Sequence, residues 1–141
     1  MPYLDLAVLC ETAIIDQATN NLSVVNQIEQ VNLPQFPAVL PRIMVVTTWQ
    51  RESEIEESFT ERISITGPSG KGLAKVEIPI RMERRRHRHL SAFANLMIET
   101  PGDYTFDIAV RPDNASTWTT RRTIILDVQK VDEPTPEEAA H

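Results

Sequence analysis

The segment from 84 to 89 carries the side chains of this sequence that are best suited to binding or chemistry. It reads Arg-Arg-Arg-His-Arg-His, so four guanidinium groups and two imidazoles fall within six residues. Guanidinium groups form paired hydrogen bonds with phosphates and carboxylates, and they remain charged at physiological pH. The sequence therefore predicts a site for an anion or a partner at Arg84, Arg85, Arg86 and Arg88.

The two histidines of this segment suggest a metal site as an alternative. His87 and His89 are two apart, so in a strand they point the same way, and cupin-like jelly rolls combine such a pair with a glutamate and a third histidine. Here the remaining histidine is His141, and the neighbouring arginines would repel a cation. A metal-dependent enzyme of the cupin type is thus a minor alternative, and we expect neither a metal nor another cofactor.

The other candidate groups do not form a catalytic set. Cys10 lies in an apolar strand, where a cysteine usually serves as a small buried hydrophobic residue. Asp103 and Asp107 share a strand face, but nothing in the sequence completes an acid–base pair or a calcium cage around them. The glycine-rich turn at 67–72 lacks the spacing and the following helix of a phosphate-binding loop. We therefore predict no catalytic residue and a protein that is not an enzyme.

Aromatic residues raise one further alternative, a platform on which sugar rings stack. Its members would be Tyr3, Trp49 and Trp118. Trp118 shares a strand phase with Ile124 and Leu126, so the simpler interpretation places it in the core.

Charge is distributed unevenly along the chain. Lysine and arginine together number 14 and aspartate and glutamate 20, which gives a formal net charge of −6 at pH 7. This balance disfavours a general nucleic-acid binder, because affinity for phosphates depends on clustered, uncompensated basic side chains. We expect the arginines of 84–88 to pair with an acidic cluster, either across neighbouring strands or between two chains. The acidic cluster consists of Glu52, Glu54, Glu56, Glu57 and Glu61.

Hydrophobic residues alternate with polar ones along much of the chain. In 103–110 the even-numbered residues are Tyr, Phe, Ile and Val, which indicates a strand with one buried face. Similar runs recur at even spacing, and about eight strand candidates predict an all-β fold, a two-sheet antiparallel β-sandwich of the immunoglobulin-like or C2-like type. Segment 4–15 is apolar on both faces, which is typical of a central strand, whereas Pro79 marks an edge strand or a bulge.

The length of 141 residues and the composition predict a single domain over 1–129. Residues 130–141 are rich in acidic residues and contain two prolines, so we expect a flexible acidic tail there. One cysteine, no recognisable signal peptide and no apolar run near the ~20 residues that span a bilayer predict a cytoplasmic protein without a membrane segment.

Three short motifs carry a resemblance to a known family. They are Leu9-Cys10-Glu11, the proline-rich segment 35–41 and the strand start at 101–108. Together they resemble a family of small bacterial proteins that is grouped as a domain of unknown function, and the likeness spans most of residues 4–128. The resemblance implies a compact β-sandwich in bacteria and assigns no activity.

The leading functional hypothesis is a non-catalytic interaction or scaffold module. It would self-associate or dock onto another protein through an exposed sheet edge or face. The alternative is a module that binds an anion or nucleic acid through the arginines of 84–88, although the acidic balance of the chain disfavours nucleic acid.

Overall fold

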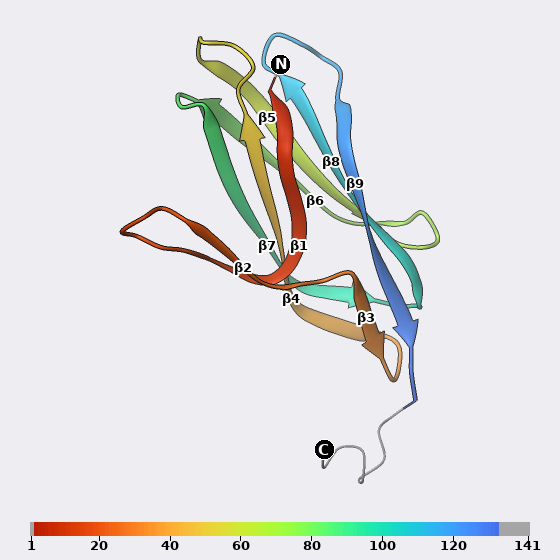
Figure 1. Ribbon diagram of the computed structural model, residues 1–141. Coiled ribbons are helices and arrows are strands. Elements are labelled where there is room, and N and C mark those ends of the chain that lie inside the picture. The colour runs from red at the N-terminus through yellow and green to blue at the C-terminus, as the bar shows by residue number, and fades with distance from the viewer. Residues whose placement is uncertain (1, 133–141) are drawn as a thin grey trace.

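The structure is a computed structural model, and it describes residues 2–132. Nine β-strands form the regular structure of this part of the chain, in two sheets that pack face to face (Figure 1). The predicted all-β, two-sheet fold is confirmed. In chain order the strands are β1 (Tyr3–Ile15), β2 (Leu22–Gln27), β3 (Gln30–Leu33), β4 (Ala38–Gln50), β5 (Glu57–Thr66), β6 (Gly72–Met82), β7 (Arg86–Ile98), β8 (Gly102–Pro112) and β9 (Thr119–Lys130).

The four strands of sheet A have the order β2-β1-β4-β7, and the five strands of sheet B have the order β3-β9-β8-β5-β6. Neighbouring strands are antiparallel except β3 and β9, which are parallel. β1 lies between β2 and β4, as its two apolar faces predict. β6, which contains Pro79, is the edge strand that this proline predicts.

The sequence pattern does not predict β2 and β3 as two separate strands. The pattern of 22–31 predicts one strand, but the chain leaves sheet A after β2 and enters sheet B at β3. Asn26, near the end of β2, has a left-handed backbone with φ of 54°. Because this conformation interrupts an extended chain, two short strands replace the single predicted one.

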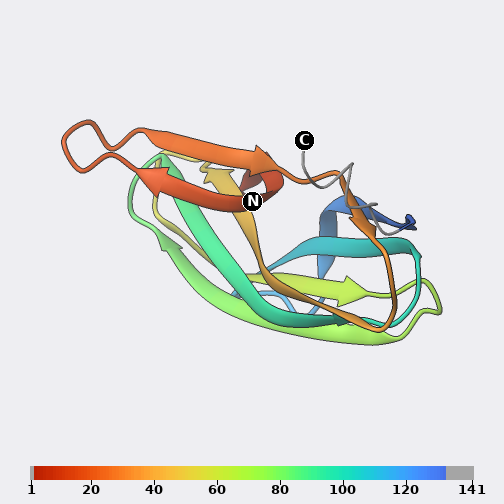
Figure 2. The ribbon, with the colours of Figure 1, turned by 90° about the horizontal axis from the view of Figure 1, so that it is seen from below.

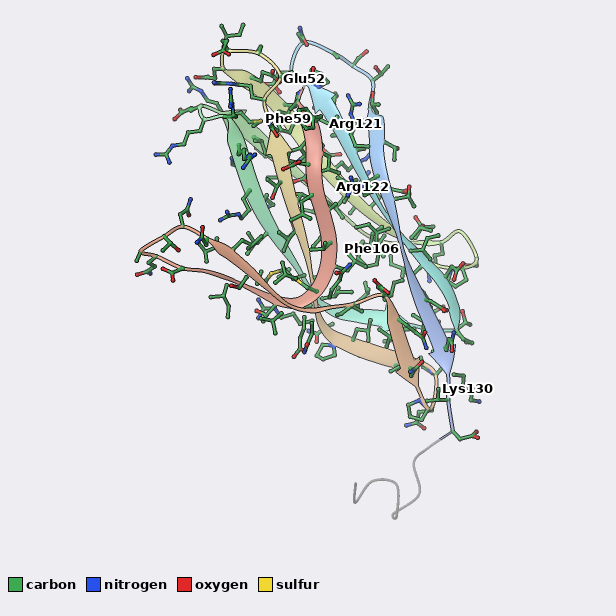
Figure 3. The ribbon with its side chains drawn as sticks, viewed as in Figure 1. Glu52, Phe59, Phe106, Arg121, Arg122 and Lys130 are labelled. Carbon is green, nitrogen blue, oxygen red and sulfur yellow. The ribbon has the colours of Figure 1, made fainter. Side chains whose placement is uncertain are left out.

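The main core fills the space between the two sheets, where Figure 3 labels Phe59 and Phe106. Trp49 of β4 is 0% exposed, and its ring meets that of Phe59 edge-on at 5.2 Å between centroids. Phe106 contacts Phe93 in the same way at 6.5 Å. Trp49 is therefore buried and cannot belong to a sugar-stacking platform, so the arrangement of Tyr3, Trp49 and Trp118 that this alternative requires does not form.

A second, smaller apolar cluster lies on the outer face of sheet A. Cys10, Met44 and Val46 are buried there, on the side of β1 and β4 that points away from the main core. Ala13 and Leu22, from the hairpin that joins β1 to β2, pack against them. Figures 1 and 2 show this hairpin standing out from the body of the two sheets. The hairpin thus covers part of a sheet face that would otherwise meet solvent.

Gly102, the first residue of β8, has a backbone that L-residues rarely adopt. Its φ is 135°, and a Cβ built there would lie 2.7 Å from Cγ of Pro68. We expect Gly102→Ala to lower the free energy of unfolding by about 1–3 kcal/mol, because strain and a steric overlap combine. Urea denaturation measures this loss. Gly72→Ala is the control, since its Cβ would meet no atom within 4 Å, and equal losses in the two variants would contradict the prediction.

The predicted boundary between domain and tail falls at the end of β9. This strand continues to Lys130, the first residue of the predicted tail. Residues 133–141, which make up most of that tail, lie outside the described residues. Within residues 2–132, no helix is long and apolar enough to cross a membrane.

Candidate functional site

The basic segment begins in the turn between β6 and β7 and continues into β7. Arg86 lies opposite Gln50 and Arg88 opposite Thr48, on the outer face of sheet A. Side chains of a strand alternate between its two faces. Arg86 and Arg88 therefore share the outer side of β7, while Arg84 and Arg85 lie in the turn before this strand. Figure 3 shows nitrogen-bearing side chains projecting from the turn and from the start of β7.

A cleft of about 430 Å³ on the outer face of sheet A is lined by Arg84, Arg86 and Arg88. We call it the arginine cleft. Its floor comes from β1, β4 and β7, and its other wall comes from the tip of the β1–β2 hairpin. The cleft brings together three of the four predicted site residues and leaves Arg85 out. The lining residues are Asp5, Ile15, Asn20, Thr48, Arg84, Arg86 and Arg88.

The hairpin tip is held against β7 by polar contacts. Arg88 donates a hydrogen bond from Nη2 to the carbonyl oxygen of Asn20 at 3.3 Å. Within the tip, Oδ1 of Asp16 accepts hydrogen bonds from the backbone nitrogens of Ala18 at 2.8 Å and Thr19 at 3.2 Å. Asn20 has φ of 59°, a conformation that asparagine tolerates better than most residues. The turn is thus closed locally, and its last carbonyl faces the cleft.

The arginines of the cleft have no carboxylate partner within the part of the chain that the structure describes. The ion pairs of the basic region are made instead by Arg81, whose guanidinium contacts Glu56 and lies 3.7 Å from Glu83. β7 lies next to β4, while the acidic cluster belongs to β5 and the loop before it, where Figure 3 labels Glu52. The prediction that the arginines of 84–88 pair with these glutamates within one chain is therefore wrong. Pairing between two chains stays a prediction.

The two histidines of the segment face the opposite side of β7. His87 lies opposite Trp49 and His89 opposite Thr47, both inward-pointing residues of β4. Burial lowers the pKa of both imidazoles, so they are neutral at physiological pH. Among residues 2–132, no three side chains of the metal-binding types lie close enough together to hold an ion. The histidines are therefore half-buried on the inward-facing side of β7 and do not line the arginine cleft.

A buried carboxylate near these histidines escaped the sequence analysis. Glu61 of β5 is 0% exposed, and its Oε1 accepts a hydrogen bond from Nε1 of Trp49 at 3.2 Å. Its Oε2 and the hydroxyl of Thr47 have no partner in the described structure. Burial raises the pKa of Glu61 above its ordinary value. The signal was present, because Glu61 has the same strand phase as the apolar Phe59 and Ile63.

Trp118 occupies a surface position that the sequence also did not reveal. The guanidinium carbon of Arg62 lies 4.3 Å from its ring centre and that of Arg111 lies 4.9 Å away. Both arginines point outward from sheet B, so the predicted core position of Trp118 is wrong. A register shift between β8 and β9 at Ile108 and Ala109 explains the error, because it reverses the strand phase before residue 122.

The fold and the cleft together define an all-β domain in which two sheets hold a group of arginines beside a hairpin. The chain belongs to the DUF6941 family, a family of unknown function, whose sequence pattern matches residues 5–121. The resemblance seen in the sequence, to an uncharacterised family, is confirmed. No curated protein matches the sequence.

Solved structures with a similar fold include the alkylpurine DNA glycosylase AlkC of Pseudomonas fluorescens, bound to DNA with an abasic-site analogue. The TM-score is 0.55 at 9% identity, and the match covers 91% of this chain but 30% of the glycosylase. The N-terminal domain of PorA matches with a TM-score of 0.31 at 8% identity, over 89% of this chain and 97% of that domain. At such low identity the first likeness concerns the fold alone, and the second supports no conclusion.

Proposed function

We propose that this protein is a non-catalytic binding module that recognises an anionic group of its partner in the arginine cleft. The observation that carries the proposal is the placement of three guanidinium groups, from β7 and the turn before it, in one cleft beside the hairpin tip. No ion pair joins them to a carboxylate of the described residues. Guanidinium groups in one cleft repel one another. A phosphate or carboxylate between them would replace that repulsion with charge-assisted hydrogen bonds.

The composition of the cleft favours an anion over other ligands. Asp5 is the one acidic side chain of its lining, against three arginines. Thr48 adds a hydroxyl that can donate a hydrogen bond to a bound anion, and the carbonyl of Asn20 orients Arg88 by accepting a hydrogen bond from it. No aromatic side chain lines the cleft, so stacking on a nucleobase or a sugar is not part of its chemistry.

Binding without catalysis is supported by the position of the remaining reactive groups. His87, His89 and Glu61 face the interior, and Cys10 is buried beneath the hairpin. None of them lines the cleft.

We place the protein in the bacterial cytoplasm, which the resemblance to a bacterial family and the single free cysteine support.

Titration with inorganic pyrophosphate in a calorimeter tests the proposed function. We expect Arg86→Ser to weaken binding at least about tenfold, because a hydrogen bond to a charged group contributes about 1.5–3 kcal/mol. Arg85→Ser is the matched control, since it removes the same charge one residue away and outside the cleft. Equal affinities of the two variants, or no binding by the wild type at low salt, would overturn the proposal.

A further inference from the structure

β7 differs from the other edge strands in being open to pairing. The edges of the two sheets are β2, β3, β6 and β7. β2 has 6 residues and β3 has 4, and β6 contains Pro79, which has no backbone donor. Short length and proline are common protections against pairing with another chain. β7 has 13 residues and no proline, and its backbone is left-handed at Asn95, where φ is 54°. The extended run from Arg86 to Ala94 therefore has neither protection.

A groove of about 350 Å³ runs beside this free edge, between β6 and β7. Leu73 and Ala74 of β6 form one side of it, and Ala92, Phe93 and Ala94 of β7 form the other. Phe93 points inward to the main core, whereas Ala92 and Ala94 lie on the same outer face as Arg86 and Arg88 and are exposed. The small side chain of Ala74 on β6 leaves room beside Phe93. The groove can thus take apolar side chains from an added strand.

The arginines precede this groove along β7, since Arg88 comes before Ala92, the first groove residue of the strand. Arg86 and Arg88 are two residues apart on one face, which places them about 6.7 Å apart along the strand. A strand added beside β7 has the same repeat, and residues directly opposite each other have Cβ atoms about 4.5–5.5 Å apart. Acidic side chains at alternate positions of such a strand would therefore lie opposite Arg86 and Arg88.

We propose that β7 accepts an extended segment of another protein as an additional strand of sheet A. Acidic residues at alternate positions of that segment contact Arg86 and Arg88, and the residues that follow place apolar side chains in the groove. The proposal rests on the proposed function, because the guanidinium groups of Arg86 and Arg88 that line the arginine cleft also hold the carboxylates of the segment. Backbone hydrogen bonds supply affinity in this mode of recognition, and the side-chain pattern supplies specificity.

Two other occupants fit the surface less well. Nucleic acid offers phosphates but no peptide backbone that can pair with the edge of β7. A second copy of this chain has alternating glutamates at 52, 54 and 56, but Glu56 already contacts Arg81 within its own chain. An acidic segment of a different protein satisfies both the arginines and the edge.

Two peptides of equal composition test the spacing. In the first, four glutamates alternate with three valines; in the second, the glutamates stand in adjacent pairs at the two ends. Fluorescence anisotropy measures their affinity for the full-length protein at low salt. We expect the alternating peptide to bind at least about fivefold more tightly, because only its carboxylates match the repeat of β7. Equal affinities would overturn the proposal.

A third peptide keeps the alternating pattern but carries a methyl group on each backbone nitrogen. It retains the charges and cannot pair with a strand edge. We expect at least about a tenfold loss of affinity, since backbone hydrogen bonds to β7 are lost. Unchanged affinity would mean that charge alone holds the peptide, and the added strand would be wrong.

Variants of the protein locate the binding surface. Ala94→Lys puts a long charged side chain into the groove and is expected to weaken binding of the alternating peptide about tenfold. Ser23→Lys introduces the same side chain on β2, the opposite edge of sheet A. We expect it to leave the affinity for the alternating peptide unchanged. Equal effects of the two lysines would place the peptide elsewhere and overturn the proposal.

The pyrophosphate titration separates this inference from the proposed function. If pyrophosphate binding depends on Arg86 but the peptides show none of the expected differences in affinity, the inference of an added strand is wrong. The proposed anion-binding function then still stands. If a single-stranded oligonucleotide binds more tightly than the alternating peptide, the partner class is wrong. Light scattering of the protein alone completes the test, because a dimer that the alternating peptide dissociates would identify a second copy as the occupant and overturn the proposal.

Discussion

Trp49→Ala is expected to lower the free energy of unfolding by about 3–5 kcal/mol, the usual loss for a large aromatic residue removed from a core. The Trp49 side chain is 0% exposed and contacts Phe59 edge-on. It also donates the single described hydrogen bond to the buried carboxyl of Glu61. The variant loses the packing and leaves a buried polar group without a donor, so both terms act in the same direction.

Trp118→Ala is the matched control for this experiment. Trp118 is partly exposed on sheet B and stacks with Arg62 and Arg111. Each such contact contributes about 0.5–1 kcal/mol at a surface site, so we expect a total loss of about 1–2 kcal/mol. Urea denaturation followed by far-ultraviolet circular dichroism compares the two, since fluorescence would change with either substitution. A larger loss for Trp118 than for Trp49 would contradict the structure.

Glu61→Gln is expected to remove one pH-dependent contribution to stability. Burial raises the pKa of Glu61 in the folded protein above its value of 4.5 in the unfolded chain. The folded state then holds the proton more tightly than the unfolded state, so the free energy of unfolding falls as the pH rises from 4.5 through the folded pKa. The amide can accept from Trp49 and donate to Thr47, and it does not ionise.

The measurement is the free energy of unfolding at pH 4 and at pH 8. At pH 8 the variant is expected to be more stable than the wild type by about 1–3 kcal/mol, the cost of an unsatisfied buried polar group. At pH 4 the difference should shrink to within about 0.5 kcal/mol. Glu77→Gln, at an exposed position of β6, controls for the loss of a carboxylate. A wild type that gains stability relative to Glu61→Gln between these pH values would refute the prediction.

The period of two was sufficient to predict the all-β fold and most of the core. It places Tyr104, Phe106 and Ile108 inside, and all three are buried. The same alternation places Glu61 inside, in phase with Phe59 and Ile63, although the other glutamates of the acidic cluster are not buried. Alternation likewise separates Arg86 and Arg88 from His87 and His89. Local pattern thus predicts which face of a strand a residue occupies.

Which strands become neighbours depends on contacts that the pattern does not contain. Nothing local places β7 beside β4 and not beside β5, and this pairing separates Arg86 and Arg88 from Glu57 and Glu61 of β5. The wall of the arginine cleft is also non-local, since Asn20 reaches Arg88 across 68 positions. The position of Trp118 depends on a register shift that no periodicity announces. Strand neighbours and register therefore account for the wrong predictions about the partners of the arginines and the position of Trp118.

The parallel pairing of β3 with β9 has a consequence for the order in which the chain folds during synthesis. β3 is an edge strand, and its one neighbour, β9, also pairs with β8. Val31 and Leu33 of β3 pack on the core only when that neighbour is present. A nascent chain that ends before residue 119 therefore leaves sheet B incomplete and its apolar side open to chaperones. Pairing of β3 with β9 is expected to be slow, because the chain loses the entropy of closing a long loop before the stabilising contacts between the two strands form.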